Sequence, residues 1–79
     1  MTIRRSIINA LHDGPSRLLI IAHNTGYLVD LVASELHDME DRGEVIQYET
    51  GLYQLSAATQ QAEQQRARHG EKTQDQTPA

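Results

Sequence analysis

The stretch TGYLVDLVASELHDMEDRGEV, from Thr25 to Val45, decides the fold of this chain. Its apolar residues recur three and four positions apart, which is the spacing of a helix with one buried face. We expect this helix to begin near Tyr27 or Leu28 and to end at Gly43, because glycine readily takes the conformation that stops a helix. The predicted buried stripe consists of Leu28, Leu31, Val32, Leu36 and Met39.

Two short runs that favour β-structure follow this helix. They are VIQY at residues 45–48 and LYQL at residues 52–55, separated by Glu49, Thr50 and Gly51. Two such runs joined by three residues that end in glycine predict a β-hairpin. Tyr48 and Tyr53 are its expected cross-strand partners over the core.

Two further helices are predicted before Thr25. The first runs from about Thr2 to His12, with Ile3, Ile7, Ile8 and Leu11 on one face, and it ends at Asp13, Gly14 and Pro15. The second is short, from Arg17 to His23, with Ser16 as its expected N-cap. A short strand near residues 17–19 is the alternative, and Asn24, Thr25 and Gly26 form a turn.

The bulk composition limits the class of protein. A chain of 79 residues holds at most one small domain, and the absence of cysteine excludes disulfides and thiolate metal sites. Without Phe or Trp the core must be aliphatic. The longest apolar run, Leu18 to Ala22, is far too short to span a membrane, so we expect a cytoplasmic protein. The net charge of −4 has the wrong sign for a general nucleic-acid binder.

The chain divides near Ser56. Residues 1–56 carry nearly all the Ile, Leu, Val and Tyr and form the predicted domain. Residues 57–69 are rich in Ala, Gln, Glu and Arg and predict a helical extension. Residues 70–79 are expected to form a disordered tail, because they hold too little apolar surface to offset the entropy lost on ordering.

Three helices followed by a two-stranded hairpin resemble the winged helix-turn-helix family over residues 3–56. The positions that carry the resemblance are Leu18, Ala22, Thr25, Gly26, Val32, Leu36, Met39, Glu40, Gly43, Val45, Tyr53 and Leu55. It implies a mainly α fold with a small β-hairpin, in which the third helix enters the major groove of double-stranded DNA and the hairpin acts as a wing. The implied function is that of a small transcriptional regulator of the kind found in phages and mobile elements.

The resemblance also assigns roles to individual residues. The residues expected to contact phosphates are Arg4, Arg5 and Arg17. At the tip of the wing, the residue expected to contact DNA is Thr50, between Glu49 and Gly51. The expected groove-facing residues are Asn24, Thr25, Tyr27, Asp30, Ala33, Ser34 and His37. Hydroxyl and amide groups contact phosphates and base edges, and Asp30 could accept a hydrogen bond from a cytosine amino group. The Tyr27 ring has two alternative roles, which the sequence does not separate: it stacks on a base, or it covers the second helix as a hydrophobic lid.

The acidity of the third helix argues against DNA. It holds Asp30, Glu35, Asp38, Glu40 and Asp41 against Arg42 alone, and cations supply much of the affinity for DNA. We expect the acids in its second half to point away from the groove. The alternative function is an adaptor or inhibitor that binds a basic protein partner. The chain has more apolar surface than a monomer needs, contributed by Leu19, Ile20 and Val29. This excess favours a partner surface such as a homodimer interface.

Other chemistry is weakly indicated. His37 and Asp41 have a spacing that can hold zinc, but a solvated histidine is the simpler interpretation. No nucleophile triad, glycine-rich phosphate loop or pair of catalytic carboxylates stands out. We therefore expect no enzyme activity, no cofactor and no metal.

Overall fold

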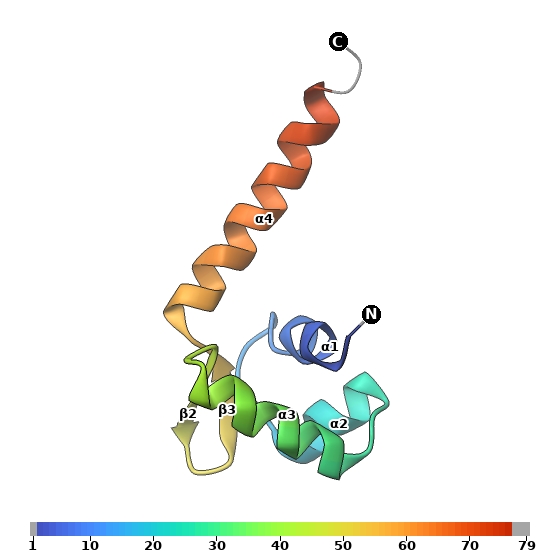
Figure 1. Cartoon of the computed structure of the whole chain (residues 1–79), viewed down its shortest axis with the longest axis vertical. Helices are drawn as coiled ribbons and strands as arrows, with labels where there is room; N and C mark the ends of the chain where they lie inside the picture. Colours follow the sequence, from blue (N-terminus) through green and yellow to red (C-terminus); the bar gives the residue numbers. More distant parts are fainter. Residues whose placement is uncertain (1, 77–79) are drawn as a thin grey trace.

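A computed structural model describes residues 2–76, with side chains described for residues 2–66. Over this range the elements follow in the order α1 (Ile3–Ala10), β1 (Ser16–Arg17), α2 (Leu18–Thr25), α3 (Val29–Asp41), β2 (Val45–Glu49), β3 (Leu52–Leu55) and α4 (Ala57–Gln76). Figure 1 shows that α1, α2, α3 and the sheet form one body, from which α4 projects. The expected mainly α fold with a small β-hairpin is confirmed at this level.

Local sequence explains how the helices begin and end. The Thr2 hydroxyl accepts a hydrogen bond of 3.1 Å from the Arg5 backbone nitrogen and so caps α1. Gly26 ends α2 with φ +78°, a left-handed conformation that favours glycine, and its N–H donates to the Ala22 carbonyl at 2.9 Å. Only Tyr27 and Leu28 then separate this turn from α3, so α2 and α3 pack as a tight pair.

The sheet has one strand more than the predicted two-stranded wing. Residues Ser16 and Arg17 form β1, which pairs antiparallel with β3 and gives the strand order β1-β3-β2. The expected N-cap role of Ser16 is therefore wrong, and Arg17 takes the N-cap position without a side-chain cap bond. The physical reason is that Ser16 and Arg17 supply backbone partners to Tyr53 and Leu52, which an isolated hairpin would leave to solvent.

The core is aliphatic, as expected, and lies between the first three helices and the hairpin. Its buried residues are Ile7, Ile8, Leu11, Ile21, Ala22, Val32, Leu36, Met39, Val45 and Leu55. Three expectations are wrong: Leu28, Leu31 and Tyr48 are exposed. The strand register pairs Tyr53 with Gln47, and an irregularity between Gln47 and Glu49 removes Tyr48 from the predicted cross-strand pair.

The C-terminal helix is longer than the sequence predicted. The extension expected over residues 57–69 is helical, and α4 continues to Gln76, into the segment for which the sequence predicted disorder. Adding a residue to an existing helix is much easier than nucleating one, and this segment is rich in helix-forming Glu, Lys and Gln. Residues 77–79 of the predicted tail lie outside the described residues. No helix in the described part of the chain is long and apolar enough to cross a membrane.

Candidate functional site

One face of α3 is open to solvent along its length. Asp30, Ser34, His37 and Asp41 recur three or four positions apart and are all exposed, which places them on this face. We call these four residues the α3 face. The His37 Nε2 atom lies 3.6 Å from an oxygen of Asp41, so the two side chains interact across one turn of this face. The structure therefore brings together three of the predicted groove-facing residues.

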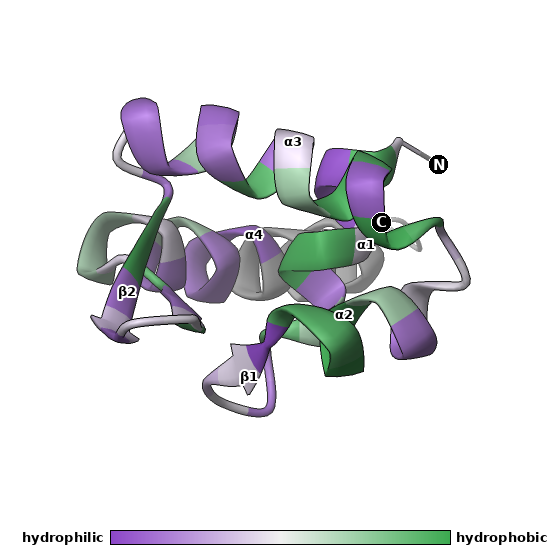
Figure 2. Cartoon of the chain, turned by 90° about the horizontal axis from the view of Figure 1, so that it is seen from below, coloured by the Kyte–Doolittle hydropathy of each residue, from purple (hydrophilic) through white to green (hydrophobic). Residues whose placement is uncertain are grey.

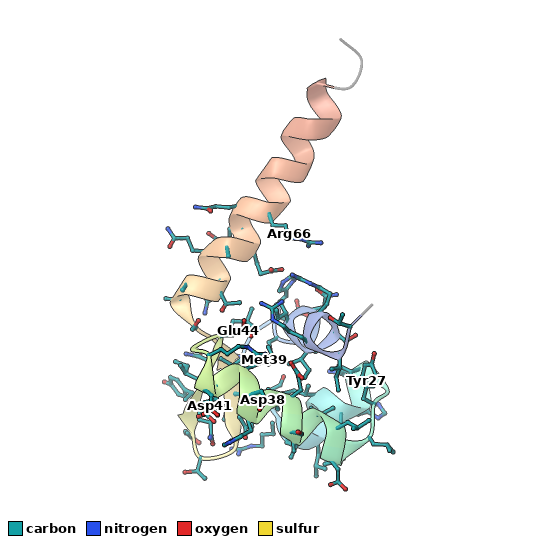
Figure 3. The ribbon with its side chains drawn as sticks, viewed as in Figure 1. Tyr27, Asp38, Met39, Asp41, Glu44 and Arg66 are labelled. Carbon is teal, nitrogen blue, oxygen red and sulfur yellow. The ribbon has the colours of Figure 1, made fainter. Side chains whose placement is uncertain are left out.

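The acids in the second half of α3 point in different directions. Asp41 belongs to the α3 face, and the neighbouring Asp38 is also exposed (Figure 3). Glu40 is directed to the hairpin, where its carboxylate accepts hydrogen bonds of 3.1 and 3.3 Å from the Gln47 amide. Asp41 lies on the same side of α3 as His37, because residues four apart on a helix share a side, whereas Glu40 is turned to the hairpin. The surface beside the hairpin is therefore acidic.

The hairpin tip stands next to Arg17. Strand β1 places Arg17 opposite Leu52, and an Arg17 Nη2 atom lies 3.7 Å from a Glu49 oxygen. Both side chains are about three-fifths exposed, at 59% and 62%, so this ion pair is easily exchanged for another partner. The Gln47 amide oxygen accepts a hydrogen bond of 2.8 Å from the Gly51 N–H and steadies the tip, where Thr50 is exposed. Arg17 and Thr50 thus belong to one surface.

Arg4 and Arg5 belong to a different part of the molecule. Arg4 donates two hydrogen bonds to the Glu44 carboxylate, at 3.0 and 3.1 Å. Arg5 donates to Glu63 of α4 at 2.6 Å, and His12 lies 3.0 Å from the same oxygen. These contacts join α1 to the loop before β2 and to α4. The structure therefore does not place the two arginines with Arg17 in a common basic surface.

The remaining predicted residues lie around the turn between α2 and α3. Asn24 is exposed, whereas the Thr25 hydroxyl is turned inward and donates to the Ile21 carbonyl at 2.8 Å. Tyr27 is half-buried against the core, close to this turn (Figure 3), which fits the lid interpretation better than a free stacking ring. Of these three residues, Asn24 alone presents its side chain to solvent.

Glu44 is a structural centre that sequence reasoning missed. Its carboxylate also accepts from Arg42 at 3.4 Å, and Arg42 donates to Glu35 of α3 at 3.2 Å. Its backbone carbonyl accepts from the Ser56 nitrogen at 3.0 Å and the Thr59 hydroxyl at 2.8 Å, at the start of α4. The Arg4–Glu44 contact spans 40 positions, so no local pattern could have revealed it.

Hydrogen bonds from the Arg4 guanidinium hold the pKa of the Glu44 carboxyl below its usual value. Because the pKa of Glu44 is lower in the folded chain, the unfolded chain takes up the proton first as the pH falls. The stability that ionised Glu44 contributes is therefore fully present above the unfolded-state pKa and is lost as the pH falls through the folded-state pKa. Between about pH 5 and about pH 3, we expect the free energy of unfolding to fall less for Arg4→Gln than for the wild type. The difference between the two should be less than about 1 kcal/mol, because Arg4 is partly solvent-exposed.

Urea unfolding followed by circular dichroism across this pH range measures the difference. Arg66→Gln is the control, since Arg66 is exposed and has no ion pair among the side chains of residues 2–66. An acid profile for Arg4→Gln that matched both the wild type and this control would contradict the assigned role of Glu44.

Residues 2–66 show no group of three side chains that could hold a metal ion, and His37 with Asp41 forms only the pair described above. The candidate site therefore consists of the α3 face, the exposed Asn24, and the hairpin tip with Arg17. Its chemistry is recognition through hydroxyl, amide, imidazole and carboxylate groups. Comparison of the chain with protein-family models, curated protein sequences and solved structures gave no match.

Proposed function

We propose that this chain is a small DNA-binding transcriptional regulator of the winged helix-turn-helix kind, with α3 as the groove-reading helix and the β2–β3 tip as the wing. The observation that carries the proposal is the arrangement of α2, the Gly26 turn and α3 beside the hairpin. In this unit α3 follows α2, its α3 face is free of packing, and the nearby hairpin tip has Arg17 of β1 in contact with Glu49. A helix-turn-helix docks its second helix in this way.

Charge limits the affinity of one copy. Asp30 and Asp41 repel phosphates, and Arg4, Arg5 and Arg42 are held in ion pairs with glutamates. Arg17 at the hairpin tip is more accessible, because its contact with Glu49 is long and exposed. A single copy should therefore bind weakly, and two copies on two half-sites would double the number of contacts. A homodimer is accordingly part of the proposal.

A protein-binding adaptor is the second candidate, and a specific surface feature favours it. Leu19 and Ile20 of α2 and Leu28, Val29 and Leu31 at the start of α3 are exposed. Figure 2 shows this concentration of hydrophobic residues along α2 and the beginning of α3. Exposed apolar surface of this extent marks protein partners more often than nucleic acid. An acidic face close to apolar side chains would suit a basic, partly apolar partner.

NMR titration of the labelled chain with a short mixed-sequence duplex tests the first proposal. At low salt we expect a Kd of about 10⁻⁴ to 10⁻⁶ M, with shifts at Asn24, along the α3 face and at Thr50 that disappear at high salt. Arg17→Ala should weaken binding to every sequence and reduce the salt slope by about 1. Ser34→Ala and His37→Ala should instead change the sequence preference.

Arg66→Ala is the matched control, because Arg66 is an exposed arginine on α4 rather than at the hairpin tip. It should leave the shift pattern on α3 unchanged. An absence of shifts at low salt, or equal affinities for the wild type and the Arg17, Ser34 and His37 variants, would refute docking through α3.

A further inference from the structure

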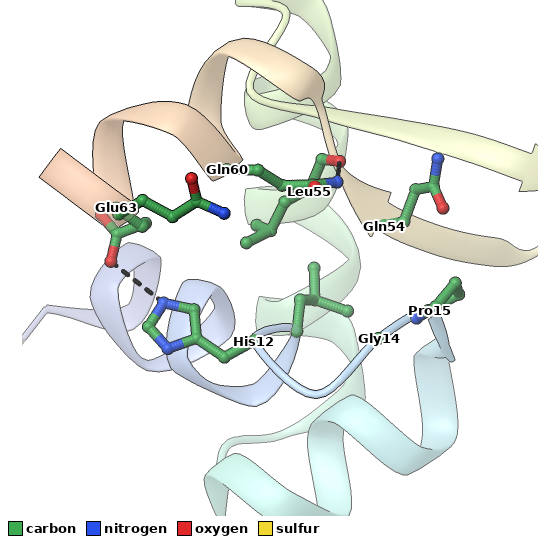
Figure 4. Close-up of a pocket in the computed structure, with 9 residues that line it drawn as sticks. His12, Gly14, Pro15, Gln54, Leu55, Gln60 and Glu63 are labelled. Carbon is green, nitrogen blue, oxygen red and sulfur yellow. Dashed lines mark hydrogen bonds and ion pairs between the residues drawn. The ribbon is translucent and has the colours of Figure 1, made fainter.

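A cleft of about 540 Å³ lies where α4 leaves the body. Its walls come from the first turns of α4, from β3 and from the loop between α1 and β1 (Figure 4). Its volume falls within the range of roughly 300 to 1,000 Å³ that is usual for small-molecule sites. The cleft is separate from the α3 face, whose residues do not line it.

The lining combines an apolar floor with amide groups. Leu11 and Leu55 are almost fully buried core residues that reach the cleft, and Pro15 adds a rigid apolar edge. Gln60 donates to the Leu55 carbonyl at 2.8 Å, which leaves its amide oxygen as an acceptor. Gln54 and Gln64 also line the cleft, and their amides make no side-chain hydrogen bond within the part of the chain that the structure describes.

The charged groups at the cleft already pair with one another. Glu63 is the acid in the lining, and its carboxylate oxygen is held by Arg5 at 2.6 Å and lies 3.0 Å from His12. Figure 4 shows the contact between His12 and Glu63 at one end of the cleft, away from Gln54. A charged ligand would need a free counter-charge to offset the loss of its hydration, and the lining supplies none. The amides favour a neutral hydrogen-bonding ligand.

We propose that this cleft binds a small neutral molecule with an apolar body and an amide-like group. The body would rest on Leu11 and Leu55, and the polar group would exchange hydrogen bonds with Gln54 and Gln64. Because the ligand contacts α4 and the α1–β1 loop together, it would stabilise the observed orientation of α4 against the body. The proposal is independent of DNA binding, since none of the positions proposed to contact DNA lines the cleft.

Three ligands of nearly equal shape test both the site and its charge preference. Benzamide is neutral, benzoate is an anion and benzamidine is a cation. We expect benzamide to bind the full chain with millimolar affinity in NMR titration and to shift the amide signals of Leu11, Gln54 and Gln64. Benzoate and benzamidine should bind at least several-fold more weakly.

Two tryptophan substitutions on α4 provide the matched comparison. Gln64→Trp places a large ring in the cleft and should reduce benzamide affinity at least tenfold, whereas Gln65→Trp, one position along the same exposed helix, should not. Failure of benzamide to shift cleft residues, equal binding by the two variants, or tighter binding of either charged ligand would overturn the proposal. These titrations contain no DNA, so their outcome is separate from that of the proposed function.

Discussion

Replacing Leu36 with alanine will lower the free energy of unfolding by about 3 kcal/mol, the usual cost of truncating a fully buried leucine. Leu36 has no exposed surface and belongs to a core cluster that draws on α1, α2, α3 and both hairpin strands. A body of this size buries little surface and has little stability to lose. We therefore expect much of the variant to be unfolded at physiological temperature, as measured by urea and thermal unfolding followed by circular dichroism.

Leu31→Ala is the matched control on the same helix. The Leu31 side chain is 52% exposed, so the same truncation should change the free energy of unfolding by no more than about 0.5 kcal/mol. Similar losses for Leu31→Ala and Leu36→Ala would mean that Leu31 is packed, as the apolar pattern of the sequence suggested. Such a result would contradict the orientation of α3 and with it the composition of the α3 face.

This comparison also shows where the apolar pattern stops being informative. Val32, Leu36 and Met39 are buried as predicted, because they follow one another on a narrow side of the helix. Leu31 lies about 100° around the helix from Val32, beyond the width that the body covers. Leu28 precedes the first helical turn with an extended backbone, at ψ 142°, so the helical spacing does not apply to it. The apolar pattern identifies a helix and the centre of its buried face, but it does not show how much of the helix surface the neighbouring elements cover.

The candidate site was predictable to the extent that it depends on one helix. The spacing from Asp30 through Ser34 to His37 placed these residues together, and the structure agrees. The surroundings of the arginines depend on contacts that are distant in sequence. The Arg5–Glu63 pair spans 58 positions, and Arg17 reaches the hairpin tip only because β1 pairs with β3. No composition or periodicity encodes such partners, so the sequence could not show that Arg4 and Arg5 are paired with glutamates and not grouped with Arg17.

If α3 docks in the major groove, Asp30→Lys will raise the affinity for a mixed-sequence duplex about tenfold at low salt. Asp30 is the acid in the first turn of α3, is exposed, and lies on the face proposed to meet DNA. The substitution removes a repulsion and adds one phosphate contact, so the slope of log K against log salt should steepen by about 0.9. Fluorescence anisotropy of a labelled duplex, measured over a range of salt concentrations, gives both quantities.

Asp13→Lys separates this local effect from a change in net charge. Asp13 is exposed in the loop between α1 and β1, and the same charge reversal there should raise affinity by no more than about twofold, because salt screens distant charges. Equal gains for the two variants would show that only net charge matters, and no gain for Asp30→Lys would favour a protein partner for the α3 face. If Asp30 accepts a hydrogen bond from cytosine, the gain will be accompanied by weaker discrimination between sequences, since the lysine cannot accept that bond. The affinity ratio between two duplexes that differ at one C·G pair therefore distinguishes a residue that merely opposes DNA from one that reads it.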